Sequence, residues 1–299
     1  LTVNTAGANL RFDNAVNATP SSPTPDAYFM RKVDIYYKNQ INRGLGYDAG
    51  EYVYSSSYDQ GEGWSGPNIT SAGALTQEFR DLNVYMAGPA NSLSVWANIA
   101  GNAPNIRNAR VRLQALTVHD APLPGFSYVR VNVNNLPLST LNNPASAFMF
   151  VENSSSNVND RITVPCMGFT YPATFNFNNS KNFYFELAAS ASGNHLLIDN
   201  FNFGSTAPAL YDLTNGKRYT GDITSVPGKV KFGLPATTTA IRRFMLVSQQ
   251  TDNILQVNGL SQKQFANFAS AAQQGDYMII SNSALFNDGN GNNYVDQYR

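Results

Sequence analysis

Residues 93–99 read LSVWANI and residues 110–118 read RVRLQALTV, and these two stretches decide the fold. In both, apolar and polar residues alternate, which places successive side chains on opposite faces of a β-strand. Similar short apolar and aromatic segments recur, separated by turn-rich stretches without helical periodicity, at residues 32–37, 51–55, 76–86, 128–133, 147–151, 173–177, 183–188 and 196–203. The pattern predicts a mainly β protein whose principal domain is an antiparallel, jelly-roll-like β-sandwich.

The sequence divides into four segments on this pattern. We expect a β-rich N-terminal segment at 1–66, the sandwich at 67–205, a β-hairpin linker at 206–256 and a different kind of domain at 257–299. Within the linker, LYDLTNGKRYTGDI (210–223) contains Asn215 and Gly216, residue types that adopt the positive φ angles of a tight hairpin turn. KVKFGL (229–234) and IRRFMLVS (241–248) supply further strands.

The last segment changes character from β to α/β. Ser261 and Gln264 have the spacing of a capping box, and an apolar helix face follows at Leu260, Phe265, Phe268, Ala269 and Ala272. Gly275 then ends the helix, and YMIIS (277–281) is as apolar as a parallel strand covered on both faces. The final residues read as a loop and the start of another helix. Because one strand cannot form a sheet, we expect the chain to be the front part of a longer protein.

Composition excludes several functions. Charged residues make up 13% of the chain, with 20 acidic and 20 basic, so no electrostatic case exists for binding nucleic acid or an acidic membrane. No run of apolar residues is long enough to span a membrane as a helix. Cys166 is the only cysteine, so an internal disulfide is impossible. Abundant Asn, Ser, Thr and Tyr suit an extracytoplasmic β protein.

The order of these segments resembles a known family. A Tyr-rich strand pair, WSGP (64–67), HLLIDNFNF (195–203), LYDLTN (210–215), IRRFMLVSQQ (241–250) and GDYMIISNSAL (275–285) follow one another as in the gingipain-like cysteine peptidases. Within that family the chain is most similar to the sortase-like branch of the type IX secretion system of Bacteroidota. The resemblance implies that residues 257–299 begin a caspase-like α/β catalytic domain.

The resemblance also implies an activity and a location for the intact protein. The family uses a Cys nucleophile with a His partner, and the sortase-like branch removes sorting signals from secreted cargo and attaches the cargo to the cell surface. The family's catalytic residues lie further along than this chain extends, so no catalytic, cofactor or metal residue is assigned. The expected partners are the downstream catalytic domain and secretion-system or cargo proteins. The expected location is the cell surface or the periplasm at the outer membrane.

Two groups of residues within the chain could form a functional site, but a structural role explains each of them more simply. Cys166 could form a dyad with His119 or His195, but Cys166 lies in an apolar β context, TVPCMGF, where a cysteine is usually a small buried residue. Asp288, Asn290, Asn292 and Asp296 have the spacing of a calcium loop. That loop has Asn293 where Gly is needed and Arg299 where a carboxylate is needed, so a polar loop is the better interpretation.

The alternative function is a cell-surface carbohydrate-binding or adhesive β-sandwich. Trp64, Trp96 and the many tyrosines could provide a platform on which sugars stack. Trp96 alternates within LSVWANI and is predicted to belong to the core, whereas Trp64 could be exposed or fill a domain junction. Whether the chain is itself an enzyme stays open at this point, and the fragment is expected to be inactive.

Overall fold

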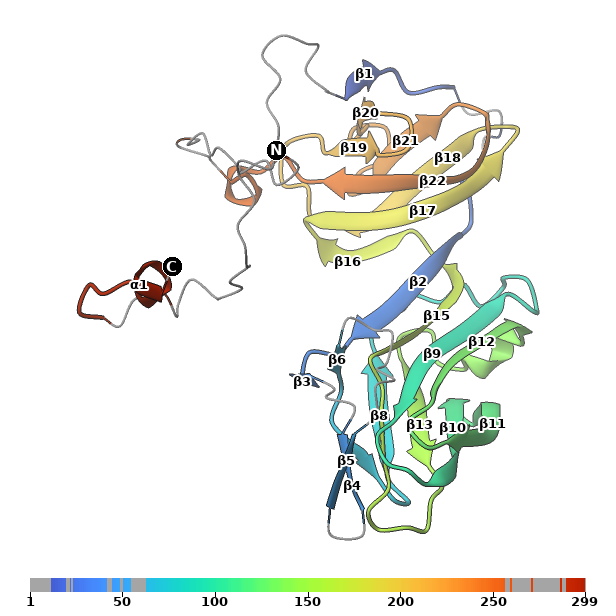
Figure 1. Cartoon of the computed structure of the whole chain (residues 1–299). Coiled ribbons are helices and arrows are strands. Elements are labelled where there is room, and N and C mark those ends of the chain that lie inside the picture. The colour runs from blue at the N-terminus through green and yellow to red at the C-terminus, as the bar shows by residue number, and fades with distance from the viewer. Residues whose placement is uncertain are drawn as a thin grey trace. The chain divides into compact units, whose positions relative to one another are not determined.

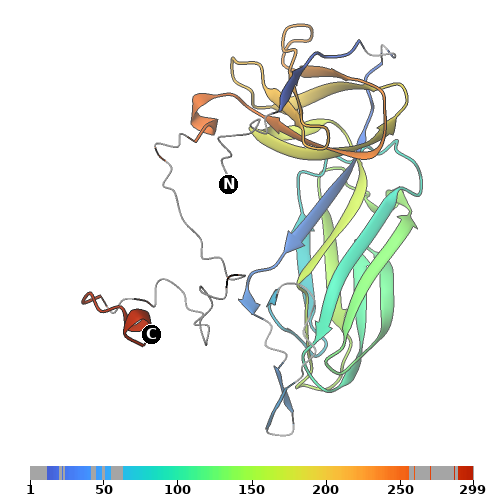
Figure 2. The same ribbon diagram turned by 45° about the horizontal axis from the view of Figure 1, so that its top comes forward.

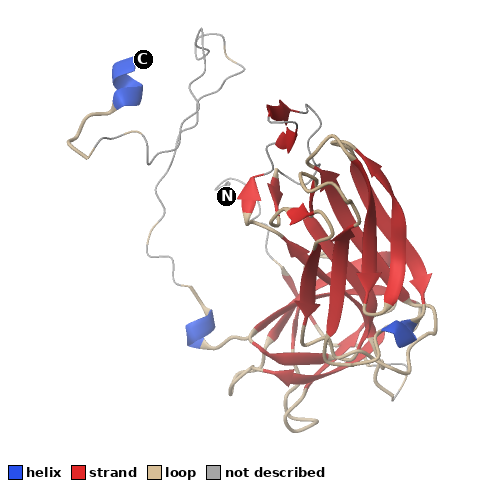
Figure 3. Cartoon of the chain, turned by 90° about the horizontal axis from the view of Figure 1, so that it is seen from below, coloured by secondary structure: helices blue, strands red, loops and turns tan. Residues whose placement is uncertain are grey.

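The computed structural model describes residues 12–19, 22, 24–41, 45–48, 51–54, 63–255, 259, 270, 286 and 289–298. The chain divides into two compact units, Leu1–Ile254 and Leu255–Arg299. The described strands all belong to the first unit, and the described part of the second contains helix α1 (Tyr294–Tyr298) (Figures 1 and 3). No described helix is long and apolar enough to cross a membrane.

Two sheets form a first β-sandwich. The four-stranded sheet has the order β11-β10-β13-β8, with bounds β8 (Ala74–Phe79), β10 (Ile106–Leu113), β11 (Leu116–Pro124) and β13 (Ala147–Asn153). The other sheet has the order β2-β15-β9-β14-β7, and β12 also pairs with β9. Its strands are β2 (Phe29–Tyr36), β7 (Ile69–Thr70), β9 (Leu93–Gly101), β12 (Tyr128–Leu136), β14 (Arg161–Thr163) and β15 (Cys166–Ala173). A 3₁₀ helix, Leu138–Thr140, follows β12.

Alternation explains how the first sandwich packs. Every second residue of β9 is completely buried, namely Leu93, Val95, Ala97 and Ile99. Phe79 of β8 meets Phe169 of β15 edge-on with ring centroids 5.0 Å apart, so the two sheets share one core. The opposite face of the larger sheet carries the residues between these positions.

A second group of strands forms another pair of sheets. The five-stranded sheet has the order β1-β20-β19-β22-β17, with bounds β1 (Asp13–Ala15), β17 (Asn182–Ser190), β19 (Ala209–Asp212), β20 (Lys217–Thr220) and β22 (Thr237–Val247). The three-stranded sheet has the order β16-β18-β21, with bounds β16 (Asn176–Ser180), β18 (Asn194–Phe201) and β21 (Val230–Leu234). Phe177 of β16 stacks on Phe183 of β17 at 3.8 Å between centroids, which joins the two sheets.

Short elements complete the first unit. β3 (Gln40–Ile41) pairs with β6 (Trp64–Ser65), and β4 (Leu45–Asp48) pairs with β5 (Glu51–Tyr54). A 3₁₀ helix, Thr251–Asn253, follows the last strand. Antiparallel pairing predominates, with parallel pairing at β1–β20 and β16–β18. The predicted mainly β, antiparallel sandwich architecture is confirmed.

The N-terminal residues connect the two groups of strands (Figure 2). β1 pairs with β20, and the Ala18 amide then donates to the Gly233 carbonyl of β21 at 2.8 Å. A side chain at Gly233 would place its Cβ 1.9 Å from the Ala18 oxygen, so only glycine fits there. β2 then joins the first sandwich beside β15. From β1 onward, the described chain therefore passes from the second group of strands to the first sandwich and then returns.

The predicted hairpin at Asn215 and Gly216 is confirmed, but of these two residues only Gly216 has the expected positive φ. Three predicted strands are wrong in extent. β19 and β20 flank that turn, and Gly216 has a φ of +63°. Residues 110–118 form a hairpin instead of one strand, because Gln114 adopts a φ of +52° between β10 and β11. Residues 173–177 span the end of β15 and the start of β16.

The predicted strand at residues 76–86 ends at Phe79. Asp81 and Asn83 both have positive φ, of 55° and 53°, which breaks the pleat. Arg31 fixes this break, because its Nη1 donates to the Asp81 carbonyl at 2.6 Å. In this segment Phe79, Leu82 and Val84 are buried, whereas Met86 is 48% exposed.

Candidate functional site

The three residues of the predicted Cys–His combinations lie in three different sheets. Cys166 starts β15 of the six-stranded sheet, His119 lies on β11 of the four-stranded sheet and His195 on β18 of the three-stranded sheet. Cys166 is 3% exposed and its Sγ accepts a hydrogen bond from Asn98 Nδ2 at 3.1 Å. These placements suit structural roles, since a dyad needs the thiolate and the imidazole within hydrogen-bond reach.

The two histidines lie in different local environments. Burial lowers the pKa of His119 and outweighs the opposing charge of Asp120. His195 is 9% exposed, and its Nδ1 lies 3.2 Å from the Ser22 carbonyl, which can only accept. Nδ1 therefore carries the proton and ties the segment before β2 to β18.

Part of the segment with calcium-loop spacing, for which a polar loop is the preferred interpretation, is described, and it forms a helix cap. Asn293 Oδ1 accepts from the Asp296 amide at 3.1 Å, and Asn293 Nδ2 donates to Asp296 Oδ2 at 2.7 Å. This pair satisfies the first turn of α1. Asp288 lies outside the described residues, as does Arg299. Within the described ranges, no three His, Cys, Asp or Glu side chains gather as a metal site would require.

The predicted α/β start cannot be compared with the structure. The predicted helix between Ser261 and Ala272, except for Ser270, lies outside the described residues. The predicted strand at 277–281 and the stop at Gly275 lie outside them as well.

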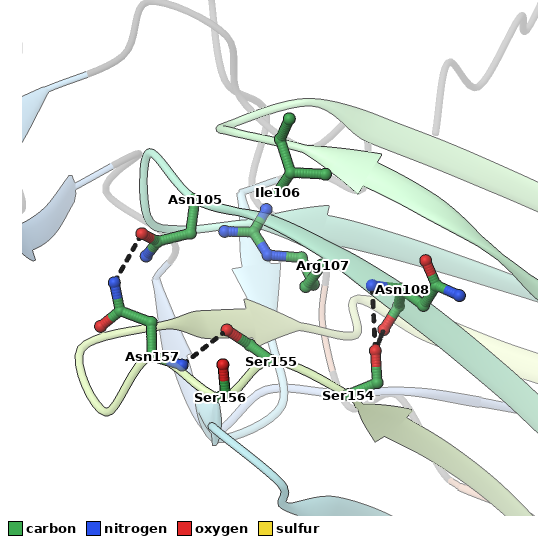
Figure 4. A pocket seen from close by; sticks show the side chains of 8 residues that line it. All are labelled: Asn105, Ile106, Arg107, Asn108, Ser154, Ser155, Ser156 and Asn157. Carbon is green, nitrogen blue, oxygen red and sulfur yellow. Dashed lines mark hydrogen bonds between the residues drawn. The ribbon is translucent and has the colours of Figure 1, made fainter.

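One pocket of about 390 Å³ opens at the end of the first sandwich, between the loop before β10 and the loop after β13 (Figure 4). Its lining is almost entirely amide and hydroxyl: Asn105, Ile106, Arg107, Asn108, Ser154, Ser155, Ser156 and Asn157. Most of these groups bind each other. Ser154 Oγ accepts from the Asn108 amide at 3.0 Å and donates to its carbonyl at 2.9 Å, and Asn157 Nδ2 donates to Asn105 Oδ1 at 2.7 Å.

A buried ion pair lies beneath this pocket. The side chains of Arg107 and Asp160 are both completely buried, and Arg107 Nε lies 3.0 Å from each Asp160 oxygen. The remaining Arg107 donors reach the carbonyls of Ala103, Leu123 and Gly125 as well as Asp160. All five guanidinium N–H groups are therefore engaged, so Arg107 ties loops together and has no donor left for a ligand.

A second hollow, of about 350 Å³, lies on the outer face of the six-stranded sheet. We call it the outer-face groove, and it is lined by Lys32, Tyr36, Ser94, Trp96, Asn132, Asn134 and Thr170. Strand register places these residues in rows across β2, β15, β9 and β12. Thr170 lies beside Lys32 and Ser94, while Asp34, Gly168, Trp96 and Asn132 form the next row. Gly168 contributes no side chain to its row.

The aromatic and charged side chains of the outer-face groove contact one another. Tyr36 is 60% exposed and its ring lies 6.2 Å from the Trp96 ring, tilted by 50°. Lys32 Nζ lies 4.9 Å from the Trp96 centroid and 3.0 Å from Asp34 Oδ2. Burial lowers the pKa of Lys32, but the hydrogen bond and charge of Asp34 outweigh it, so the pKa is raised overall. The ammonium therefore stays charged and neutralised by Asp34.

The prediction that Trp96 belongs to the core is wrong. Trp96 is partly exposed and lines the outer-face groove, while its neighbours Val95 and Ala97 are completely buried. The signal was present in LSVWANI, since residues of one strand alternate between faces and Leu93, Val95 and Ala97 already occupy the inner one. Trp64 is 44% exposed on β6 and does not line this groove. The sequence could not reveal that Tyr36 and Asn132 lie beside Trp96, because that depends on strand pairing.

Comparisons with known proteins find structural likeness only. No family model and no curated protein matches the sequence. The chain is similar to dimeric latent PorU from Porphyromonas gingivalis, with a TM-score of 0.49 and 9% identity over 79% of this chain. The matched part spans 22% of the PorU chain's length.

Two carbohydrate-binding modules are also similar in structure. The CBM36-1 domain of a multidomain xylanase from the hindgut metagenome of Trinervitermes trinervoides gives a TM-score of 0.30 and 6% identity, covering 46% of this chain and 96% of that one. A CBM36 module in complex with calcium and xylotriose gives 0.29 and 11%, covering 46% and 98%. All three TM-scores lie below 0.5.

Proposed function

We propose that this chain is the non-catalytic N-terminal β region of a gingipain-like cysteine peptidase of the sortase-like branch. The order of its sequence motifs, from WSGP at 64–67 to GDYMIIS at 275–281, supports the assignment to this family. The observation that carries the non-catalytic role is the separation of Cys166, His119 and His195 into three sheets. The catalytic groups of the intact protein would then come from the domain that residues 257–299 begin.

The role proposed for the β region is to support that domain and to contact cargo or secretion-system proteins. The way the two groups of strands are held together favours a stable support. β1 pairs with β20 while β2 pairs with β15, so the N-terminal residues bridge both groups. Phe29 of β2 also contacts Phe175 and Phe185, with centroids 5.0 and 5.7 Å away. The proposed location is the cell surface or the periplasm at the outer membrane.

The alternative, a carbohydrate-binding or adhesive protein of the cell surface, is favoured by one observation. The outer-face groove joins Tyr36 and Trp96 to uncharged polar side chains. The two functions are compatible, because a β region that supports a catalytic domain can also carry a binding site.

A peptidase assay of the chain with and without Cys166→Ala tests the non-catalytic role. We expect no hydrolysis of a broad peptide library by either protein, since Cys166 is buried and bonded to Asn98. The measurement is peptide cleavage followed by mass spectrometry. Hydrolysis by the wild-type chain that disappears in Cys166→Ala would show that the chain itself is a cysteine peptidase. Circular dichroism of both proteins establishes that the variant is folded.

A further inference from the structure

We propose that the outer-face groove binds a neutral oligosaccharide chain across β2, β15, β9 and β12. This inference rests on the carbohydrate-binding alternative given above and deepens it by naming the binding surface and the ligand class. It does not depend on the identity of the catalytic domain. It rests on the rings of Tyr36 and Trp96 and on the uncharged groups beside them.

The Tyr36 ring is unusually exposed for an aromatic side chain on a β-sheet. Large aromatic side chains normally bury most of their surface, and a Tyr that is 60% exposed beside a partly exposed Trp leaves apolar surface in contact with water. Ring faces carry negative potential and attract the polarised C–H groups on one side of a pyranose ring. Tyr36 and Trp96 are tilted by 50° to each other, so they would hold two successive sugars in different orientations.

The other lining groups suit hydroxyls. Asn132 and Asn134 each offer donors and acceptors, and Ser94 and Thr170 offer hydroxyls that can do either. A sugar hydroxyl likewise donates and accepts, so these four side chains can pair with it in several orientations. Asn132 and Asn134 are exposed, which keeps their amides accessible from solvent.

The charges around the groove select against other ligands. Its one lining cation, Lys32, is paired with Asp34 at 3.0 Å, so the lining itself presents no uncompensated cation to a phosphate or carboxylate. Arg130 lies in the next row of β12 outside the lining, and its Nε donates to the Tyr128 hydroxyl at 2.9 Å. A nucleic acid requires clustered basic residues, and the chain as a whole has a formal net charge of zero. A peptide strand added to a sheet requires a free edge, whereas this groove lies on a face. A neutral, hydroxyl-rich chain is the ligand class that remains.

The position of Lys32 indicates that an entering sugar must displace its ammonium from the Trp96 ring. Lys32 Nζ lies over the Trp96 ring, 4.9 Å from the ring centroid. Because Lys32 is an exposed side chain on a flexible stem, a sugar can displace it from the ring while Asp34 keeps the ammonium paired. Stacking on Trp96 should therefore change the surroundings of that indole.

The test uses the whole chain and tryptophan fluorescence. The protein has two Trp residues, so Trp64→Phe leaves Trp96 as the single indole reporter. Cellohexaose, xylohexaose, mannohexaose and N-acetylchitohexaose are titrated in turn. We expect at least one of them to give a saturable change in Trp96 emission, with an affinity equal to that of wild type measured by calorimetry.

Two groove variants and one matched control locate the site. Tyr36→Ala and Asn132→Ala should each weaken binding about tenfold or more, as expected when a central contact is lost. Both residues are exposed, so both variants should keep the wild-type fold. Trp64→Ala removes an aromatic residue that is 44% exposed and lies outside the groove, and it should leave the affinity unchanged.

Four results would overturn the proposal. The first is that none of the four oligosaccharides binds at millimolar concentration, and the second is that Tyr36→Ala and Asn132→Ala leave binding unchanged. The third is that Trp64→Ala abolishes binding. The fourth is that light scattering shows a dimer which Tyr36→Ala dissociates. The last would show that a second copy of the chain covers the groove. None of these results bears on whether a catalytic domain follows residue 299.

Discussion

Replacing Arg107 by Leu should lower the free energy of unfolding by about 3–5 kcal/mol, because it leaves the Asp160 carboxylate buried without its cation. Both side chains are completely buried, and Arg107 also holds the carbonyls of Ala103, Leu123 and Gly125. These bonds connect the loop before β10 with the end of β11 and the loop before β14. Urea denaturation followed by circular dichroism measures the change.

An exposed arginine provides the matched control. Arg110 pairs with Asp120 at 2.8 Å, but its side chain is 44% exposed, so Arg110→Ala should cost no more than about 1 kcal/mol. Combining Arg107→Leu with Asp160→Leu should recover part of the loss, since no isolated charge remains. Equal effects of Arg107→Leu and Arg110→Ala would contradict the role given to the buried pair.

The same pair predicts how stability depends on pH. Burial on its own raises the pKa of Asp160, but the hydrogen bonds and charge of Arg107 outweigh it, so the pKa lies below its usual value. A lowered carboxyl pKa contributes stability that is fully present above about pH 4 and is lost as the pH falls through the folded-state value. The acid-induced loss of stability should therefore be smaller in Asp160→Asn, starting from a lower stability at neutral pH.

The second large effect is expected from Phe29→Ala, which should cost about 3–5 kcal/mol. Phe29 is 4% exposed and its ring contacts those of Phe175, Phe177, Phe183 and Phe185, at centroid distances of 5.0, 6.1, 6.4 and 5.7 Å. It lies on β2 of the first sandwich, while Phe177, Phe183 and Phe185 lie on strands β16 and β17 of the second group. Its loss should therefore weaken the connection between the two groups as well as the core.

Calorimetry separates these two consequences. We expect the wild-type protein to unfold the first unit in one transition and Phe29→Ala to show two, because the groups then unfold with less coupling. Phe148→Ala is the control, since Phe148 is 37% exposed on β13 and should cost less than about 1 kcal/mol. A single transition with an unchanged midpoint in Phe29→Ala would show that this aromatic cluster does not join the two groups.

The fold class could be predicted from the sequence because alternation reports burial directly. LSVWANI, KVDIYY and YVRVNV correspond to β9, β2 and β12, and the turn at Asn215 and Gly216 was identified from residue type alone. Two of the three errors in strand extent fall where a non-glycine residue adopts a positive φ. Asp81, Asn83 and Gln114 end or fold strands that their side-chain pattern would have continued. Such conformations depend on tertiary contacts, as the bond from Arg31 to the Asp81 carbonyl shows.

The candidate sites were harder to predict than the fold. The buried partner of Arg107 is Asp160, 53 residues away, and nothing in local spacing connects them. The outer-face groove is assembled from four strands whose order is not sequential, so Tyr36 and Trp96 meet only through β15. The apolar β context of Cys166 predicts a buried side chain, and its 3% exposure confirms the burial.

The central claim is that this β region precedes a cysteine peptidase domain, and reading the gene beyond the codon for Arg299 tests it most directly. We predict an open reading frame that continues with alternating strands and helices and contains a His followed by a Cys in loops after later strands. A stop codon shortly after Arg299 would contradict the claim and leave a β-sandwich protein whose function must lie in its own surfaces.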